Sequence, residues 1–405
     1  MSEPAAPRPP LQSLDEALAR LLSAVAPLGR VERVSTFEAL GRVLAAEVVS
    51  TLDVPPADNT AMDGYALRVA DAAAGVLPIS QRVPAGSVPQ PLQPGTAARI
   101  FTGAPIPPGA DCVVMQELCE AVEGGVRIKA EPSPGQHIRR RGEDVQQGAT
   151  VLAAGHKLDA AALGLAASVG AATLQVAARP RVALFSTGDE LVMPGEPLKP
   201  GAIYNSNRFT LRGLLQGLGC EVIDLGIVPD SLDATRVALR EAAAQADLII
   251  TSGGVSVGEE DHLRPAVQAE GRLDLWQIAI KPGKPLAFGR VKDAWFIGLP
   301  GNPVSSFVTF LLLVRPVILR LQGATSLTPR GFSLRADFAW PRADKRREFL
   351  RARLNERGGL DLFANQSSGV LTSAVWGDGL VDNPPGQTVA PGQMVHFTPF
   401  SELLS

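Results

Sequence analysis

The sequence predicts a multidomain protein built around a doubly wound α/β domain with a mostly parallel sheet. The chain has 405 residues, which is more than one hydrophobic core usually supports. Between residues 181 and 321, apolar β-type runs alternate with helical patterns, as they do in βαβ units. Short β-like runs separated by Pro and Gly flank this part and indicate smaller β-rich domains.

Composition and charge exclude several classes of protein. Hydrophobic residues make up 45% and charged residues 20% of the chain, which is a globular composition. The formal net charge of -3 provides no overall basic field, so we expect neither nucleic acid nor an anionic membrane as the main partner. Only three cysteines occur, without a C-x-x-C motif, and the first residues lack the apolar core of a signal peptide. We therefore expect a soluble, cytoplasmic protein.

The beginning of the chain predicts helices followed by a β-rich domain. Apolar residues at helical spacing follow Ser13 and predict helices at residues 13–25 and 36–46. From residue 51 to residue 144 the pattern changes to short β-like runs, among them residues 111–115. This stretch predicts a β-rich inserted domain.

The next helical pattern suggests that the first domain is discontinuous. Residues 158–168 predict a helix and residues 173–176 a strand. We expect these elements to pack on the N-terminal helices, so that residues 1–50 and 145–178 form one domain around the insertion.

The α/β domain is expected at residues 179–326 and a C-terminal β domain at residues 327–405. The predicted α/β strands are residues 181–185, 221–228, 247–251 and 294–299, and the predicted helices are residues 205–218, 231–244 and 303–321. The predicted C-terminal strands are residues 331–338, 348–354, 360–364 and 394–397. The apolar run at residues 307–321 is expected to be broken at Arg315-Pro316 and too short to span a bilayer.

Three loops of the α/β domain predict an anion site. Ser-Thr-Gly-Asp-Glu at residues 186–190, the glycine-rich segment at residues 252–261 and Leu-Pro-Gly-Asn-Pro at residues 299–303 each follow a strand. Glycines let backbone N–H groups approach an anion, and a helix that opens with Ser305 favours negative charge. A single such loop is equally an ordinary strand-to-helix turn. Together, with their carboxylates, the loops predict a phosphate and Mg²⁺ site.

Two further patterns carry clustered charge. Lys281-Pro-Gly-Lys284-Pro places two lysines on a stiff loop suited to an oxyanion, although a solvated turn has the same composition. In the inserted domain, the segments at residues 56–65 and 139–144 mix acids, amides and arginines. They form either a surface ion-pair cluster or a second wall of the site, contributed to a partner subunit.

The loops together resemble one family, the molybdopterin molybdenumtransferases of the MoeA and gephyrin E-domain group. The motifs that carry the resemblance occur in the family's order and span nearly the whole chain. They are Pro-Ala-Asp-Asn-Thr-Ala-Met-Asp-Gly-Tyr-Ala from residue 56, Phe-Thr-Gly-Ala from 101, Arg-Arg-Arg-Gly-Glu-Asp from 139, Ser-Thr-Gly-Asp-Glu-Leu from 186, Ser-Gly-Gly-Val-Ser-Val-Gly from 252, Lys-Pro-Gly-Lys-Pro from 281 and Pro-Gly-Asn-Pro-Val-Ser from 300.

The resemblance implies four domains, with a MogA-like α/β domain, a discontinuous helical N-terminal domain and a C-terminal domain similar to a β-barrel. It implies a Mg²⁺-dependent transferase that inserts molybdate into adenylylated molybdopterin and releases AMP and molybdenum cofactor. It also implies a homodimer whose site is completed across subunits. Expected partners include a molybdopterin adenylyltransferase and molybdoenzyme apoproteins or their chaperones.

The resemblance also assigns site residues. The implied catalytic residues are Asp58, Asp144, Asp261 and Lys281, and the implied metal ligands are Glu190, Asp230 and Asp261. The implied substrate-binding residues are Thr102, Arg139, Ser252, Gly253, Gly254, Ser256, Lys284, Pro300, Gly301, Asn302, Ser305, Arg351 and Ser373. One departure is Gln277, which stands where some similar members carry a lysine.

Two other functions compete with this reading. A molybdopterin adenylyltransferase or nucleotide pyrophosphatase would use the same α/β domain, but the additional domains disfavour it. A non-enzymatic scaffold of the gephyrin type is the third hypothesis, and the retained acids argue against it.

Overall fold

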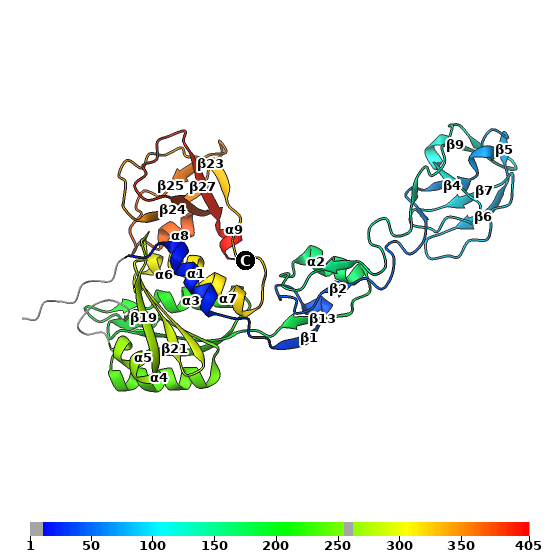
Figure 1. Cartoon of the computed structure of the whole chain (residues 1–405). Coiled ribbons are helices and arrows are strands. Elements are labelled where there is room, and N and C mark those ends of the chain that lie inside the picture. The colour runs from blue at the N-terminus through cyan, green and yellow to red at the C-terminus, as the bar shows by residue number, and fades with distance from the viewer. Residues whose placement is uncertain (1–10, 255–261, 405) are drawn as a thin grey trace, which may run out of the picture.

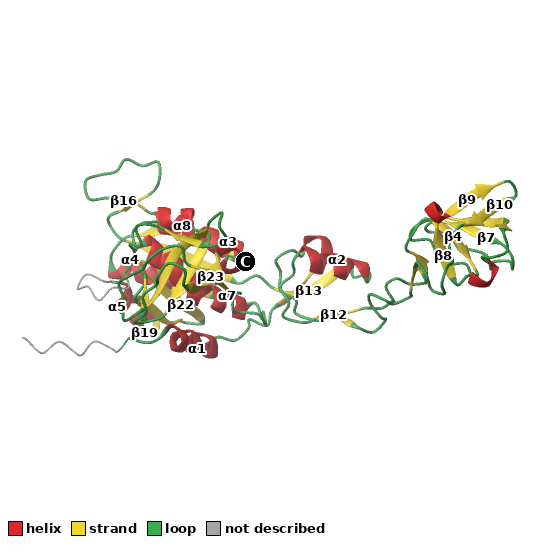
Figure 2. Ribbon diagram, turned by 90° about the horizontal axis from the view of Figure 1, so that it is seen from above, coloured by secondary structure: helices red, strands yellow, loops and turns green. Residues whose placement is uncertain are grey.

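The computed structural model describes residues 11–254 and 262–404 and shows three parts arranged in a row (Figure 1). At one end the α/β domain and the C-terminal domain form a large body. A small middle part follows, and a β-rich part lies at the far end of the molecule. The view from above shows the same elongated arrangement (Figure 2). The predicted multidomain fold class is confirmed.

The distal part is the inserted β-rich domain. Its main sheet has the order β6-β7-β4-β8, and a second sheet has the order β5-β10-β9. Gly64 in β4 is required by close packing, because a Cβ there would lie 2.0 Å from the Val114 carbonyl oxygen of β8. The strands are β4 (Gly64–Leu67), β5 (Val76–Leu77), β6 (Ile79–Val83), β7 (Ala97–Ile100), β8 (Cys112–Met115), β9 (Cys119–Val122) and β10 (Gly125–Ile128).

The middle part joins two separate stretches of the chain. Strand β1 (Val31–Ser35) pairs with β13 (Thr173–Ala177), and β2 (Val48–Val49) pairs with β12 (Thr150–Leu152). Helix α2 (Ala160–Ser168) packs on them with its own small core. The chain therefore enters and leaves the distal domain through this part.

The prediction of a helix at residues 36–46 is wrong. Only a 3₁₀ turn, Thr36–Glu38, forms there, and Val43 and Leu44 instead make β-bridges to Lys157 and Val176. Pairing with a distant segment outweighed the local helical spacing. Phe37 is left 94% exposed.

The first helix, α1 (Leu14–Ala24), lies on the large body rather than on α2, contrary to expectation. Ser13 caps it with a complete capping box, in which its hydroxyl accepts from the Glu16 N–H and its own N–H donates to the Glu16 carboxylate. Leu14 and Leu21 are buried in the core of the α/β domain together with Leu321. Helix α1 thus ties the start of the chain to the body that holds most of the predicted site.

The α/β sheet has the order β17-β14-β18-β22-β21-β19. Its first four strands are parallel, and β21 and β19 add an antiparallel edge that the sequence analysis missed. The strands are β14 (Arg181–Thr187), β17 (Glu221–Val228), β18 (Leu248–Ser252), β19 (Gly271–Gln277), β21 (Pro285–Val291) and β22 (Ala294–Leu299). The covering helices are α3 (Ser206–Gly217), α4 (Leu232–Gln245) and α5 (Leu263–Glu270).

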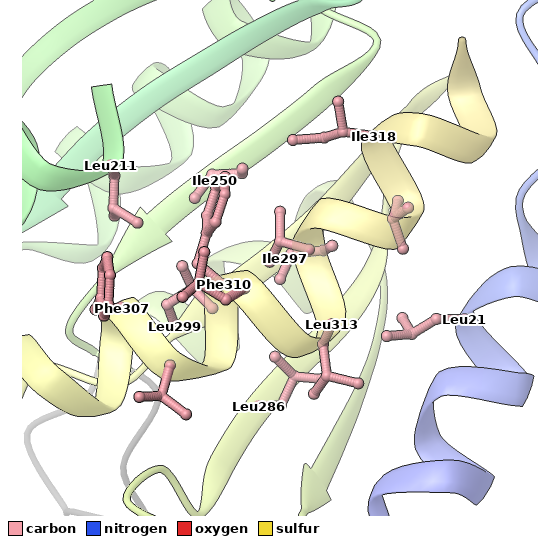
Figure 3. Close-up of a cluster of buried hydrophobic side chains, with 14 of the residues drawn as sticks. Leu21, Leu211, Ile250, Leu286, Ile297, Leu299, Phe307, Phe310, Leu313 and Ile318 are labelled. Atoms are coloured by element: carbon pink, nitrogen blue, oxygen red, sulfur yellow. The ribbon is translucent and has the colours of Figure 1, made fainter. Parts of the chain in front are cut away.

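The core of this domain is organised around the apolar helical stretch Pro303–Leu321 (Figure 3). It consists of α6 (Pro303–Thr309), a π-helical turn (Phe310–Val314) and α7 (Arg315–Leu321). Pro316 does not break it, because the π turn absorbs the change, with the Arg315 N–H bonded to the Phe310 carbonyl. Its 19 residues are long and apolar enough to cross a membrane, contrary to expectation, but 89% of an apolar 18-residue stretch within it is buried inside the protein. It is a core helix.

The C-terminal domain is joined to the α/β domain by a shared strand pair. The short strand β20 (Ile280–Lys281) leaves the α/β domain and pairs in parallel with β24, so that Lys281 lies opposite Glu348. The sheet order is β20-β24-β26-β27-β23, with β25 beside β24. The other strands are β23 (Phe332–Arg335), β24 (Arg347–Leu354), β25 (Leu360–Leu362), β26 (Gly379–Asn383) and β27 (Met394–Pro399).

Replacing Phe310 with alanine should destabilise the protein strongly. The ring is fully buried in the core of Figure 3, so truncation leaves a cavity and should lower the free energy of unfolding by about 3 to 5 kcal/mol. Urea unfolding followed by tryptophan fluorescence measures the change. The matched control is Phe37→Ala, which should stay within about 0.5 kcal/mol of wild type because that ring is exposed. Equal losses for the two variants would contradict this assignment of the core.

Candidate functional site

A cavity of about 1010 Å³ lies where the α/β domain meets the C-terminal domain. Its walls come from the loops after β14, β18 and β22, from the Lys281–Pro285 loop and from residues 366–369. Most site residues predicted for the α/β domain line it. These are Glu190, Ser252, Gly253, Gly254, Lys281, Lys284, Pro300, Gly301, Asn302 and Ser305.

The strand ends meet because the three parallel strands are in register. Ser186 pairs with Ser252, and Ser252 pairs with Leu299, so the following loops begin at one edge of the sheet. The Ser186 and Ser252 hydroxyl oxygens lie 3.3 Å apart and are buried. The three loops therefore surround a common space, as the sequence analysis predicted.

Glycine keeps the floor of this space open. Gly253 has φ +90°, and a Cβ there would lie 3.2 Å from the Thr187 carbonyl oxygen. A Cβ on Gly301 would meet the Cα of Gly253 at 3.8 Å. Because two loops approach each other through glycines, backbone rather than side chain faces the cavity, which suits close approach of an anion.

The amino end of α6 forms another wall. Pro303 occupies its first turn, and Ser305 is buried beside the cavity. The side chain of Asn207 donates to the Gly301 carbonyl (2.7 Å), which holds the preceding loop, and its own oxygen has no hydrogen-bond partner within the described residues. Helix amino ends favour anions because their first N–H groups are unpaired and the helix dipole is positive there.

The two lysines of the Lys281–Pro285 loop differ in their surroundings. Lys281 Nζ donates to Glu348 Oε1 (3.0 Å) and lies 3.3 Å from Asp344 Oδ2. Hydrogen bonds from Arg346 lower the pKa of Asp344, and burial raises it by less. The pKa therefore stays well below its usual range, and this carboxyl is ionised. No ion pair involves Lys284 among residues 11–254 and 262–404. Lys284 therefore offers the less compensated positive charge to the cavity.

The predicted metal ligands are only partly brought together. Glu190 lines the cavity, whereas Asp230 does not, and its backbone N–H donates to Asp189 at 3.4 Å. Asp261 and the predicted binding residue Ser256 lie outside the described residues. Within the described part of the chain, no group of three Asp, Glu, His or Cys residues has the arrangement of a metal centre.

Arg351 and Ser373 lie behind the cavity wall rather than on it. Arg351 Nε donates to Ser373 Oγ (3.0 Å), and its backbone N–H donates to the Gln366 side chain (2.9 Å). Arg351 Nη2 also reaches the Ser367 carbonyl at 3.4 Å. Burial lowers the pKa of the Arg351 guanidinium to about 10. In this structure the pair supports residues 366–369, which do line the cavity.

The residues predicted in the inserted domain lie far from this cavity (Figure 1). Asp58 accepts from Arg140 Nη1 (2.6 Å) and from the Arg141 N–H (2.9 Å), so hydrogen bonding from these arginines holds its pKa below the usual value. Thr102 donates to Asp63 at 2.7 Å. The other two predicted residues are Arg139 in β11 (Ile138–Arg139) and Asp144, both exposed. Within one chain, these residues do not form a second wall of the site.

Several cavity residues were not predicted. Asn205 and Asn207 begin α3, and their cap pattern was read only as a helix signal. Arg346 and residues 366–369 come from the C-terminal domain, and no local motif marked them. Gln277, the noted departure, ends β19 and does not line the cavity.

Comparison with known proteins places nearly all of the chain in three matched regions. Residues 12–170 match "MoeA N-terminal region (domain I and II)", residues 183–320 match "Probable molybdopterin binding domain" and residues 333–400 match "MoeA C-terminal region (domain IV)". A molybdopterin molybdenumtransferase of Haemophilus influenzae is 42% identical over 404 residues, covering 97% of this chain and 99% of that protein.

Other relatives agree with this match. Molybdopterin molybdenumtransferase 2 of Mycobacterium tuberculosis is 37% identical over 390 residues, covering 92% of this chain and 95% of that protein. The crystal structure of a molybdopterin biosynthesis moeA protein from Pyrococcus horikoshii OT3 is similar with a TM-score of 0.83 at 29% identity, covering 96% of this chain and all of that one.

Gly283→Ala should disturb the lysine loop of the site. Gly283 has φ +102°, and a Cβ there would lie 2.4 Å from Thr309 Oγ1 and 3.3 Å from the Ser305 carbonyl oxygen. Gly201→Ala is the matched control, because Gly201 has φ +85° with no atom within 4 Å of its Cβ position. We expect a loss of about 1 to 2 kcal/mol for Gly201→Ala from backbone strain. Gly283→Ala should lose about 1 to 3 kcal/mol more from overpacking. Equal losses in chemical unfolding would contradict the tight packing of this loop on α6.

Proposed function

The chain belongs to the MoeA family, and we infer from this that it is a transferase that supplies molybdenum to molybdopterin in molybdenum-cofactor synthesis. The curated relatives that cover nearly the whole chain carry the name molybdopterin molybdenumtransferase. The adenylyltransferase, nucleotide pyrophosphatase and scaffold hypotheses are not favoured. The observation that supports this function best within the structure is that one cavity joins the loops after three parallel strands to two lysines.

The finer chemistry is our proposal. Molybdate is a tetrahedral dianion, and adenylylated molybdopterin carries two linked phosphates, so both need cationic and N–H donors. The strand-end loops and the amino end of α6 suit the phosphates, and Lys284 suits molybdate. Attack of water on the bond between the two phosphates would release AMP and leave one phosphate on the pterin. Two thiols of the pterin would then bind molybdenum, and their protons would leave with one molybdate oxygen as water.

The residues present fit Mg²⁺ in part. Glu190 and Asn207 line the cavity, the Asn207 side-chain oxygen is buried without a hydrogen-bond partner among the described residues, and magnesium binds few protein oxygens together with substrate phosphates. We propose Glu190 and Asp261 as ligands, while Asp230 would act from outside the cavity. Bound Mg²⁺ would neutralise phosphate charge as AMP leaves.

We also propose that the active form is a homodimer in which the distal domain of one subunit completes the cavity of the other. Asp58, Thr102, Arg139 and Asp144 belong to the distal part, away from the cavity of their own chain, and the distal domain of a partner subunit would supply the corresponding residues. A cytoplasmic location suits the three free cysteines. We also propose that the protein interacts with a molybdopterin adenylyltransferase and with molybdoenzyme apoproteins or their chaperones.

Lys284→Ala should weaken the use of molybdate. A charge-assisted hydrogen bond contributes about 1.5 to 3 kcal/mol, so the molybdate concentration for half-maximal AMP release should rise on the order of tenfold or more. The assay supplies adenylylated molybdopterin and Mg²⁺ and quantifies AMP by chromatography. Lys292→Ala is the control, because Lys292 lies in the turn between β21 and β22, at the opposite end of β21 from Lys284. An unchanged molybdate dependence in Lys284→Ala would refute this role.

Mixed dimers should reveal a site shared between subunits. We expect Asp261→Ala and Asp58→Ala each to fold and to release little AMP alone. Co-expression gives about half heterodimers, each with one of two sites intact, so activity should recover to about a quarter of wild type. Sedimentation and circular dichroism check assembly and folding. If the mixture stays as inactive as the separate variants, Asp58 does not complete the partner's site.

A further inference from the structure

The position of Lys281 depends on a carboxylate that does not face the cavity. Glu348 is only 1% exposed and is absent from the cavity wall. Its Oε1 accepts from Lys281 Nζ at 3.0 Å, and its Oε2 accepts from Trp340 Nε1 at 2.8 Å and from Asn383 Nδ2 at 3.2 Å. Three donors from three segments of the chain therefore converge on one buried side chain.

The backbone determines this meeting. Lys281 lies opposite Glu348 in the parallel pair of β20 and β24, and Asn383 lies opposite Glu348 in the antiparallel pair of β24 and β26. Trp340 is held by reciprocal backbone hydrogen bonds with Val389. Because strand pairing fixes all of these segments, the carboxylate can hold Lys281 in one orientation with little freedom lost on binding.

Lys281 lies at the boundary between two cavities. Its side chain lines both the main cavity and a second cavity of about 750 Å³ whose wall includes Phe338, Trp340 and Phe363. Lys281 Nζ is 6.0 Å from the centre of the Trp340 ring. Glu348 binds both the lysine and the indole N–H, so it sets how these two groups stand relative to each other at the boundary.

Charge separates the roles of the two lysines. Lys281 stands between the carboxylates of Glu348 and Asp344, which offset its positive charge, whereas Lys284 has no ion pair within the described residues. A lysine compensated in this way is a weaker attractor of anions than a free one. We therefore expect Lys281 to contribute to the reaction through the direction of its N–H donors rather than through its charge.

We propose that Glu348 is a positioning residue of the transferase, which holds the Lys281 ammonium in the orientation that contacts the oxyanion in the main cavity. This inference rests on the proposed function. Glu348 itself never touches substrate. An ionised carboxylate is required, because it offers acceptors on both oxygens, whereas a glutamine amide would present its NH₂ group to at least one of the three donors.

The test is a double-mutant cycle of Glu348→Gln and Lys281→Met, read as kcat and KM for molybdate in AMP release. Each single change should lower kcat/KM on the order of tenfold, and the double variant should fall within about twofold of Lys281→Met alone. Losses that multiply would overturn the proposal, since Glu348 would then act independently of Lys281. An active Lys281→Met would overturn it as well.

A matched control separates positioning from general stability. Asp382 pairs with Arg347 at 2.5 Å in the same two strands, one residue along and on the other face of the sheet. Asp382→Asn should lower the unfolding midpoint but leave kcat/KM within about twofold of wild type. If it lowers activity as much as Glu348→Gln does, the effect of Glu348 is structural and the proposal fails.

A replacement variant and the wild-type measurement complete the test. If Glu348→Gln does not fold, Glu348→Asp replaces it in the cycle, because it keeps the charge and withdraws the carboxylate by one methylene. A wild-type protein that releases no AMP would overturn the proposed function. A wild-type protein that does release AMP, with multiplying losses in the cycle, would overturn only the role of Glu348.

Discussion

The alignment of β14, β18 and β22 is the constraint on which the rest of the structure depends. Their parallel register brings Ser186, Ser252 and Leu299 to one edge of the sheet, so three loops distant in sequence open into one space. The side chains of the buried helical stretch Pro303–Leu321 pack against these strands (Figure 3). Residues at the amino end of this stretch line the cavity. The strands and the helix that form the core of the α/β domain therefore also position the walls of the site.

The junction between the α/β and C-terminal domains gives the cavity its second half. A two-residue strand, β20, crosses from one domain to the other and carries Lys281 with it. Helix α1 packs on the core of the α/β domain, and its Asp15 pairs with Arg347 of the C-terminal domain, which fastens the domains on another side. Because the domains are held at several places, the cavity walls that each domain contributes keep a fixed separation, which catalysis by positioning requires.

The elongated shape separates most of the predicted functional residues that the structure describes into two sets. One set lines or supports the cavity, and the other lies on the distal domain among its own ion pairs, whereas Asp230 belongs to neither. Asp58 and Thr102 are each hydrogen-bonded inside the distal domain, so their local geometry does not depend on the cavity. The proposed dimer would bring the two sets together and would make activity depend on assembly as well as on folding.

The sequence by itself determined the alternation of strands and helices, the glycine-rich loops, the two lysines and the family, because each is written in neighbouring residues. It also placed most of the cavity's α/β residues at strand ends. Only the tertiary structure decided that residues 36–46 form bridges instead of a helix, that α1 lies on the large body, and that Arg351 stands behind the wall. It alone joined Glu348 to Lys281 across 67 positions of sequence. Such contacts arise from strand pairing and burial between distant segments, for which local periodicity carries no signal.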